Sequence, residues 1–340
     1  MTEQLKPEKI EALLRLIDQS NEIAIITHVN PDGDAIGSSL AWQAFLRERG
    51  KAARVIVPNP FPDFLKWMEG SGDILVYSGN RKKCEETLAG AELLFCLDFN
   101  SLSRLDALGR FLETLNPKKV LIDHHIGTVE RGFDLAFSKV AASSTSEIVY
   151  RIIRATTGVN RVAPRIAEAL YAGIMTDTGA FAHSCDPDLF RLAADLMECG
   201  IDRAKIHALV YSNFSEHRMR LMAHCLSNKM EVLPEHRTAI MSLTREELDR
   251  FRFEPGDTEG FVNIPLGIKG VIFSVFFVES KDEFIKLSLR SVGNFSVDSV
   301  ARKYFNGGGH KNASGGKIFA PMNESIALFK SILPKLRIES

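Results

Sequence analysis

The segment "ITHVNPDGDAIGSS" (Ile26–Ser39) continues the apolar run "IAII" and places His28, Asp32 and Asp34 within seven residues. The apolar run predicts a buried strand, and the proline and glycine that follow it permit a turn before a helix. Two carboxylates this close together repel each other, so a compensating positive charge is expected beside them. The segment therefore predicts a strand, a turn that carries polar ligands, and a helix.

Strand and helix patterns alternate through the N-terminal half. Short buried strands are expected at residues 22–28, 54–58, 92–98 and 119–125, and helices at 38–50 and 104–115. This alternation predicts an α/β fold with a doubly wound, mostly parallel sheet. A run of helices follows from residue 143 to about 230. Beyond it, strands at 238–243, 270–280 and 284–291 and helices at 296–305 and 323–333 predict a smaller α/β domain with a mixed sheet.

The predicted domain organisation has three parts. Residues 1–190 form a catalytic metal-binding domain, residues 191–225 a helical connector, and residues 226–340 a substrate-binding domain. The formal charge is −3 for residues 1–225 and +2 for residues 226–340. This small asymmetry favours the second domain as the one that holds an anion.

Composition excludes several classes of protein. A hydrophobic content of 45% and a charged content of 25% are ordinary for a globular chain, and no apolar run is long enough for a membrane helix. The N-terminus does not resemble a signal peptide, and the five scattered cysteines fit reduced thiols, so a cytoplasmic location is expected. A net charge of −1 argues against a protein that coats long nucleic acid.

More polar residues follow the other expected elements. Asp98 ends one strand, Asp123, His124 and His125 end another, and Asp177 follows a helical segment. The carboxyl ends of parallel strands share one edge of a sheet, so these side chains should converge. Each pair of converging carboxylates costs roughly 4 kcal/mol at about 4 Å with an effective dielectric of about 20. Any one of these aspartates alone could be a helix N-cap. Together they predict a site for two divalent ions, for which imidazole and carboxylate favour manganese, iron, cobalt or zinc over magnesium alone.

At this point the motifs carry a resemblance to a known family. "HVNPDGDAIGS", "LDFNSLSRL", "IDHH" and "TDTGAF" resemble the ordered motifs of the DHH phosphoesterases, and "GGGHKNASGG" (Gly307–Gly316) resembles the signature of their associated C-terminal domain. The resemblance covers nearly the whole chain. It is strongest to the NrnA-type enzymes, which degrade very short oligoribonucleotides and dephosphorylate 3′-phosphoadenosine 5′-phosphate (pAp).

The resemblance implies a role for each motif residue. One metal would be bound by His28 and Asp32, and the other by Asp34, His124 and Asp177, with Asp98 bridging the two. Mn²⁺ is the expected ion, with Mg²⁺ or Co²⁺ as alternatives. A hydroxide bridging the metals would attack phosphorus, His125 would protonate the leaving oxygen, and Asp123 would orient a histidine. The alternative for His125 is a structural role.

Further residues are expected at the substrate. Asn100 and Arg104 would border the site, with Arg104 clamping a phosphate or else facing solvent. In the second domain the expected substrate-binding residues are Arg290, Ser291, Gly308, Gly309 and His310. The glycine-rich segment is expected to be neither helix nor strand and to point N–H groups at an anion. Ser143, Ser144 and Thr145 are expected to cap a helix.

The expected substrates are single-stranded RNA of two to five nucleotides or a nucleotide bisphosphate. No long nucleic acid and no membrane is expected as a partner, and the chain would be a monomer or a homodimer. Alternative functions are a cyclic- or linear-dinucleotide phosphodiesterase, or a non-catalytic nucleotide- or RNA-binding protein. Manganese pyrophosphatases share the metal motifs but lack the "GGGH" segment, and exonucleases of this superfamily that act on single-stranded DNA are usually longer.

Overall fold

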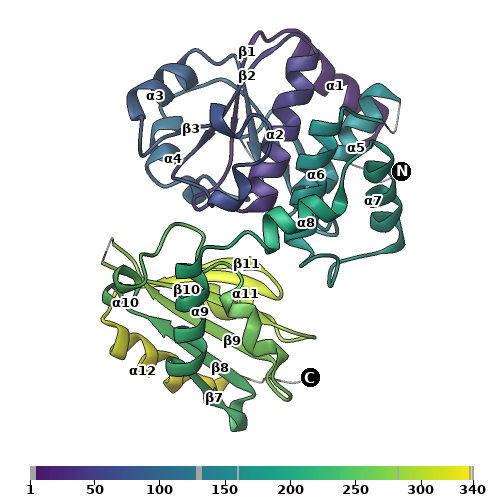
Figure 1. Ribbon diagram of the computed structural model, residues 1–340. Helices are drawn as coiled ribbons and strands as arrows, with labels where there is room; N and C mark the ends of the chain where they lie inside the picture. Colours follow the sequence, from purple (N-terminus) through teal and green to yellow (C-terminus); the bar gives the residue numbers. More distant parts are fainter. Residues whose placement is uncertain (1–4, 128–131, 159–160, 282, 337, 339–340) are drawn as a thin grey trace. The chain divides into compact units, whose positions relative to one another are not determined.

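The computed structural model describes residues 5–127, 132–158, 161–281, 283–336 and 338 (Figure 1). The chain divides into two compact units, Met1–Asn213 and Phe214–Ser340. Each unit has its own sheet and its own apolar cores. No helix in the described ranges has the length and apolar character needed to cross a membrane.

The first unit contains a sheet of six strands among the described residues, in the order β3-β2-β1-β4-β5-β6. All neighbouring strands are parallel, which confirms the predicted parallel sheet. The short strands β3 and β6 were not predicted. The bounds are β1 (Glu22–Ile26), β2 (Ala52–Val57), β3 (Leu75–Val76), β4 (Leu93–Leu97), β5 (Lys118–Asp123) and β6 (Leu135–Ser138).

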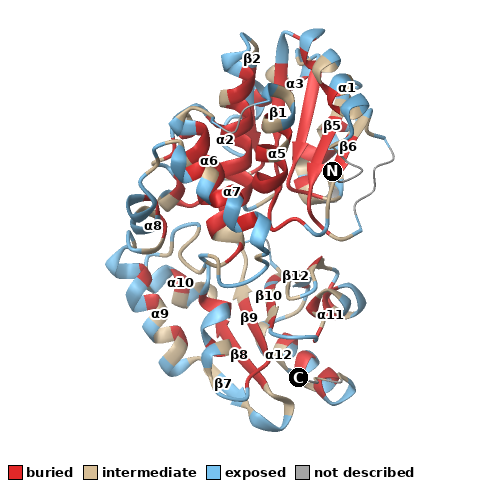
Figure 2. Cartoon of the chain, turned by 90° about the vertical axis from the view of Figure 1, so that its right-hand side faces the viewer, coloured by how far each residue is buried: buried red, intermediate tan, exposed pale blue. Residues whose placement is uncertain are grey.

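Helices cover both faces of this sheet, and alternate residues of β1 show why. Ile23 and Ile25 belong to a core shared with α1, α2, α5 and α6, whereas Ala24 and Ile26 belong to a core shared with α3 and α4. The strands are accordingly buried along most of their length (Figure 2), and the doubly wound prediction is confirmed. The helices are α1 (Pro7–Asp18), α2 (Gly33–Glu48), α3 (Arg81–Ala89), α4 (Ala107–Leu112), α5 (Thr145–Thr157), α6 (Pro164–Asp177), α7 (Pro187–Glu198) and α8 (Arg203–Tyr211).

Two predicted helices differ from the observed ones. Helix α2 begins at Gly33, five residues earlier than expected, because the Asp32 side chain caps its N-terminus. The expected helix at 104–115 is reduced to α4, preceded by a 3₁₀ turn over Leu102–Leu105. Asp106 separates the two with a φ of 50°, a left-handed conformation that a continuous helix does not accommodate.

The second unit contains a sheet of six strands, again counting described residues, in the order β11-β12-β10-β9-β8-β7. Strands β8 and β9 pair in parallel and the other neighbours are antiparallel, so the predicted mixed sheet is confirmed. One core is shared with α11 and α12, and another with α9. The elements are α9 (Glu216–Asn228), β7 (Met230–Leu233), β8 (Thr238–Leu243), α10 (Arg245–Arg250), β9 (Phe273–Glu279), β10 (Ile285–Ser291), α11 (Val297–Tyr304), β11 (Gly308–His310), β12 (Ala313–Ile318) and α12 (Met322–Ile332).

The expectation that the glycine-rich segment is neither helix nor strand is wrong. It forms β11 and most of β12, which pair antiparallel. Its glycines allow close packing rather than irregular backbone. A Cβ atom at Gly316 would lie 2.7 Å from the Cβ of Phe305, and one at Gly307 would lie 1.9 Å from the carbonyl oxygen of Gly315. Only glycine permits the backbone to approach its neighbours so closely.

Candidate active site

The motif residues of the first unit converge at the carboxyl ends of the central strands. Strands β1, β4 and β5 are neighbours in the sheet, and they lead directly into His28, Asp98 and the triplet from Asp123 to His125. Helix α2 begins between Asp32 and Asp34, and helix α6 ends at Asp177. Four separate stretches of the chain therefore contribute to one edge of the sheet, as the sequence predicts.

Several groups of possible metal ligands include residues of this edge, and two of them share no residue. In each group the ligand atoms lie within 4.8 Å of one another; the first contains His28, Asp32 and Asp98, and the second contains Asp34, His124 and Asp177. His28 Nε2 is 3.4 Å from Asp98 Oδ2, and His124 Nε2 is 3.5 Å from Asp98 Oδ1. The two oxygens of the Asp98 carboxylate thus face different groups.

The electrostatics of the cluster show an excess of buried negative charge when its carboxylates are ionised. Burial, together with the nearby carboxylates of Asp34 and Asp32, holds the pKa of Asp98 well above its usual range. Burial also raises the pKa of Asp34. Burial, and then the charge of Arg104, lowers the pKa of His28 to about 4, so its imidazole is neutral at pH 7, the state that metal binding requires. Buried carboxylates beside a neutral imidazole fit divalent cations, which offset the repulsion.

Asp32 is both a helix cap and a group that faces the cluster. Its Oδ1 accepts hydrogen bonds from the N–H groups of Asp34 and Ala35, each 3.1 Å long. Its Oδ2 lies 3.9 Å from His28 Nε2. One oxygen of Asp32 therefore caps α2, as an aspartate at this position can, and the other faces His28.

Asp123 and His125 form a buried pair beside the cluster. The Asp123 carboxylate is fully buried, and its Oδ1 lies 2.7 Å from His125 Nδ1. This contact holds the His125 ring with its Nδ1–H directed at the carboxylate, so Nε2 is the atom through which the ring can exchange a proton. Burial lowers the pKa of His125, whereas the Asp123 contact opposes that shift.

Asn100 and Arg104 both border this edge. The Asn100 side chain donates a 2.9 Å hydrogen bond to the carbonyl of Ile126, which follows the Asp-His-His triplet. The carbonyl of Arg104 accepts a 2.8 Å hydrogen bond from the N–H of Val29. The positive charge of the Arg104 side chain lowers the pKa of His28 and of His125. Asn100 therefore braces one ligand-bearing loop against another, and Arg104 places a cation within electrostatic reach of the imidazoles.

Two candidate residues of the second unit, Arg290 and Ser291, donate hydrogen bonds within that unit. Arg290 donates to the carbonyls of Leu289 and Ser314 at 3.0 and 3.4 Å. Ser291 is buried and donates to the carbonyl of Phe295 at 2.6 Å.

Two more contacts complete this frame. The N–H of Gly309 donates to the Asp298 carboxylate at 2.8 Å, so a carboxylate of the chain already occupies that donor. Gly308 pairs with Gly315, and His310 pairs with Ala313, across the β11–β12 hairpin.

The start of α5 makes contacts that the sequence analysis did not find. Ser144 caps the helix, as predicted, by accepting from the N–H of Glu147 at 3.0 Å. Thr145 instead donates its hydroxyl to Asp98 Oδ1 at 2.9 Å, and the N–H groups of Thr145 and Ser146 donate to the two oxygens of Asp34. In the sequence, the run Ser143, Ser144 and Thr145 could have indicated these contacts. The same run is equally typical of an ordinary helix N-terminus.

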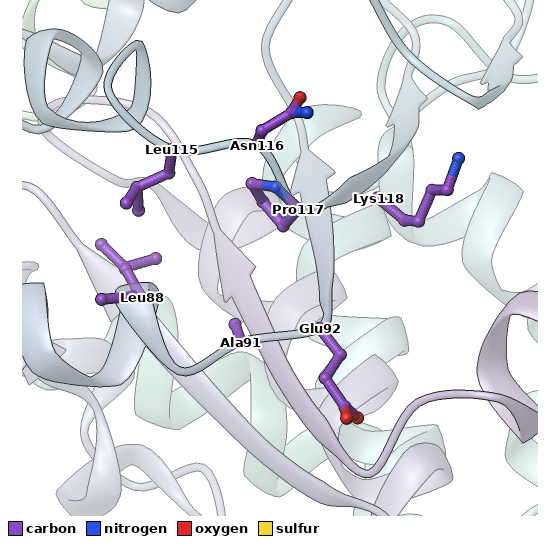
Figure 3. A pocket seen from close by; sticks show the side chains of 8 residues that line it. Leu88, Ala91, Glu92, Leu115, Asn116, Pro117 and Lys118 are labelled. Carbon is purple, nitrogen blue, oxygen red and sulfur yellow. The ribbon is translucent and has the colours of Figure 1, made fainter.

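The opposite edge of the same sheet has a different character. A hollow open to solvent lies where β4 and β5 begin, lined by Leu88, Glu92, Asn116 and Lys118 among others (Figure 3). The carboxylate of Glu92 accepts hydrogen bonds from the N–H groups of residues 21 and 22. No histidine or cysteine lines this hollow. The groups suited to catalysis gather at the carboxyl edge instead.

Comparison with known proteins agrees with this geometry. The model of the DHH family N-terminal domain matches residues 22–174, and that of the DHHA1 domain matches residues 239–333. The bifunctional oligoribonuclease and PAP phosphatase NrnA of Thermus thermophilus is 31% identical over 87% of this chain and 84% of its own length. Its namesake from Bacillus subtilis is 28% identical over 91% of this chain and 93% of its own length.

The chain belongs to the DHH family. A crystal structure of an exopolyphosphatase-related protein from Bacteroides fragilis matches this DHH protein with a TM-score of 0.90 and 42% identity, over 98% of each chain. The DHH chain is therefore a phosphoesterase related to NrnA, a hydrolase that acts on ester bonds, and its second unit contains a DHHA1 domain.

Proposed function

We propose that this DHH phosphoesterase is a manganese-dependent enzyme that hydrolyses short oligoribonucleotides to mononucleotides and pAp to AMP. The single observation that carries the proposal is the position of Asp98. Its two oxygens face separate groups of His and Asp ligands, which suits a carboxylate shared by two ions. The names of the NrnA relatives support the substrate class.

Each ion has a set of ligands in this proposal. His28 and Asp32 would hold one ion, Asp34, His124 and Asp177 would hold the other, and Asp98 would be shared by the two. The mixture of imidazole and carboxylate favours Mn²⁺, with Mg²⁺ or Co²⁺ as substitutes. When bound, such a pair of ions supplies a water of lowered pKa and neutralises charge on the phosphoryl oxygens.

The proton for the leaving group comes from His125. Its Nδ1 is directed at Asp123, 2.7 Å away, so the proton is delivered from Nε2. Asp123 orients the ring and stabilises its protonated form, because a buried carboxylate next to an imidazolium is a compensated pair. Hydrolysis in this scheme proceeds without a covalent bond between the protein and the substrate.

The remaining residues bind the substrate. Arg104 clamps a phosphate with its planar guanidinium, and Asn100 keeps the loop after the Asp-His-His triplet in place. In the second unit the residues that contact the nucleotide lie on β10 and β11, and they are Arg290, Ser291, Gly308, Gly309 and His310. A substrate held by a few such groups needs only one or two nucleotides, whereas long RNA would require an extended basic groove.

A substrate panel tests this proposal. The chain is stripped with a chelator, reloaded with Mn²⁺ or Mg²⁺, and incubated with labelled RNA of two to five nucleotides, pAp, a cyclic dinucleotide and pyrophosphate. We expect turnover of short RNA and pAp that is restored better by Mn²⁺. Preferential turnover of the cyclic dinucleotide would change the substrate class, and full activity without bound metal, checked by elemental analysis, would refute the metal mechanism.

A further inference from the structure

The first turn of α5 reaches both groups of metal ligands. Thr145, the first residue of this helix, is fully buried. Its hydroxyl donates to Asp98 Oδ1 at 2.9 Å, and its N–H donates to Asp34 Oδ2 at 2.6 Å. The next N–H, that of Ser146, donates to Asp34 Oδ1 at 2.8 Å. One residue thus contacts two carboxylates that belong to different groups.

The hydrogen bond from the Thr145 hydroxyl fixes the orientation of the Asp98 carboxylate. Asp98 has a φ of 65°, so its backbone is in the left-handed region, and its N–H continues the sheet by donating to Ile122. The side chain can still rotate about its terminal bond, because carboxylate torsions are broad. The Thr145 hydroxyl donates a hydrogen bond to Asp98 Oδ1. The other oxygen, Asp98 Oδ2, therefore faces His28 and lies 3.4 Å from His28 Nε2.

Capping of α5 accounts for the N–H groups of Thr145 and Ser146 that donate to Asp34, but not for the contact between the Thr145 hydroxyl and Asp98. Ser144 accepts from the N–H of Glu147, and the N–H of Ser143 in turn donates to Glu147 Oε2 at 2.7 Å. Together with Asp34, these contacts satisfy N–H groups at the start of the helix without the Thr145 hydroxyl. The side chain of Thr145 is therefore available for another purpose, and it is used on Asp98.

We propose that Thr145 is a positioning residue for the metal centre, which orients Asp98 through its hydroxyl and Asp34 through its N–H. The inference rests on the proposed function, because it assigns Thr145 to the same ligand groups. Hydrogen bonds to metal-ligating carboxylates fix the direction in which their remaining lone pairs point, and losing such a bond typically weakens metal binding about 10- to 100-fold.

The test measures metal binding directly. Mn²⁺ is titrated by calorimetry into the chelator-stripped full chain, and the electron paramagnetic resonance spectrum of bound Mn²⁺ is recorded. Thr145→Val keeps the N–H and the side-chain volume but removes the hydroxyl, so we expect its Kd for Mn²⁺ to rise about 10- to 100-fold. Thr145→Ser keeps the hydroxyl and should remain within about threefold of the unsubstituted protein.

Ser144→Ala is the matched control, since it removes the cap and touches neither carboxylate. It should lower the Tm by about 2–4 °C and leave the Kd for Mn²⁺ unchanged. If Thr145→Val does not fold, Thr145→Ala removes the same hydroxyl without placing a methyl against Asp98 and carries the test. An unchanged Mn²⁺ Kd in a folded variant that lacks the hydroxyl would overturn this inference.

The result separates the two proposals. If the unsubstituted protein binds no Mn²⁺, the proposed metal mechanism fails. If it binds Mn²⁺ and the valine variant binds equally well, only the role of Thr145 fails. An equal loss of Mn²⁺ affinity in Ser144→Ala and Thr145→Val would also overturn the inference, because it would trace the effect to the helix start rather than to the hydroxyl.

Discussion

The carboxyl edge of the first sheet and the glycine hairpin of the second unit were both expected to bind charged groups, yet they satisfy their polar atoms differently. At the first, buried carboxylates face one another, and the pKa of Asp98 is held well above its usual range. At the second, Asp298 accepts from Gly309 and from Arg302, and Ser291 bonds to Phe295 and Asn312. The first region gathers buried carboxylates that added positive charge would stabilise, whereas in the second Asp298 and Ser291 have hydrogen-bond partners within the same unit.

This difference indicates a division of labour. A region with uncompensated buried carboxylates gains free energy when cations bind, so chemistry based on metals belongs there. A region whose hydrogen bonds are made internally is a rigid frame, and a few side chains on it can position a ligand. Four substitutions test this contrast, from the largest expected effect to the smallest.

Asp98→Asn should abolish activity while making the metal-free protein more stable. Burial and neighbouring carboxylates raise the pKa of Asp98 in the folded state, so its ionised form opposes folding. This opposition is absent well below the unfolded pKa of 3.8 and grows as the pH rises above it. The amide carries no charge, so at pH 7 with a chelator present we expect a Tm higher by about 2–4 °C for each kcal/mol regained.

Asp106→Asn is the control for that experiment, because Asp106 is exposed and lies outside the ligand groups. It should change neither the activity nor the Tm appreciably. A metal-free Asp98→Asn protein that is less stable than the unsubstituted chain at pH 7 would contradict the electrostatic account of this edge.

His125→Ala should retain bound metal and lose about 10²–10⁴-fold in kcat, the usual contribution of a general acid. The ring is oriented by Asp123 and contributes a proton, not a metal ligand, in the proposed mechanism. Elemental analysis and kcat are measured together, with His207→Ala as a surface control. Loss of a metal ion from His125→Ala would show that the roles within the Asp-His-His triplet are assigned wrongly.

Arg290→Ala should lose about 10- to 100-fold in kcat/KM on dinucleotides and pAp, which corresponds to one charge-assisted hydrogen bond. Hydrolysis of bis-p-nitrophenyl phosphate, which has no second nucleotide, should change little. Arg250→Ala in the same unit serves as the control. Equal losses on both substrates would mean that Arg290 supports the fold or the chemical centre, and the proposed division of labour would be wrong.

Glu247→Gln should have the smallest effect, on stability alone. The pKa of Glu247 is lowered to about 2: burial opposes this shift, but hydrogen bonds from Thr244, His224 and Lys229 outweigh it. A depressed pKa contributes stability above the unfolded value of 4.5 that is lost as the pH falls toward 2. After allowance for solvent screening the contribution is about 1 kcal/mol.

The Tm difference between Glu247→Gln and the unsubstituted protein should therefore be full at pH 7 and vanish near pH 2. Glu246→Gln, an exposed neighbour, should show no such dependence. Activity and Mn²⁺ binding should be unaffected, since Glu247 lies outside the ligand groups. A Tm difference that persists at low pH would indicate a packing effect rather than an electrostatic one.

The sequence by itself determined the parallel sheet and the set of residues at its carboxyl edge. Short apolar runs indicate buried strands. When the strands are parallel, the polar residues that follow them lie at one edge of the sheet. The sequence alone therefore predicts that His28, Asp98 and the Asp-His-His triplet lie together. The strands of the second sheet were predictable because apolar runs and alternation are properties of a single strand.

Only the tertiary structure decided how those groups are held. The N–H of Thr145 meets a carboxylate 111 residues earlier in the chain, and no local pattern encodes a contact at that distance. The role of Gly316 in the glycine hairpin also depends on tertiary contacts. From the sequence this glycine suggests a flexible position, whereas in the structure it allows β12 to pack against Phe305. Local periodicity specifies elements and faces, whereas partners and orientations depend on which faces meet, and that is settled only when the chain packs.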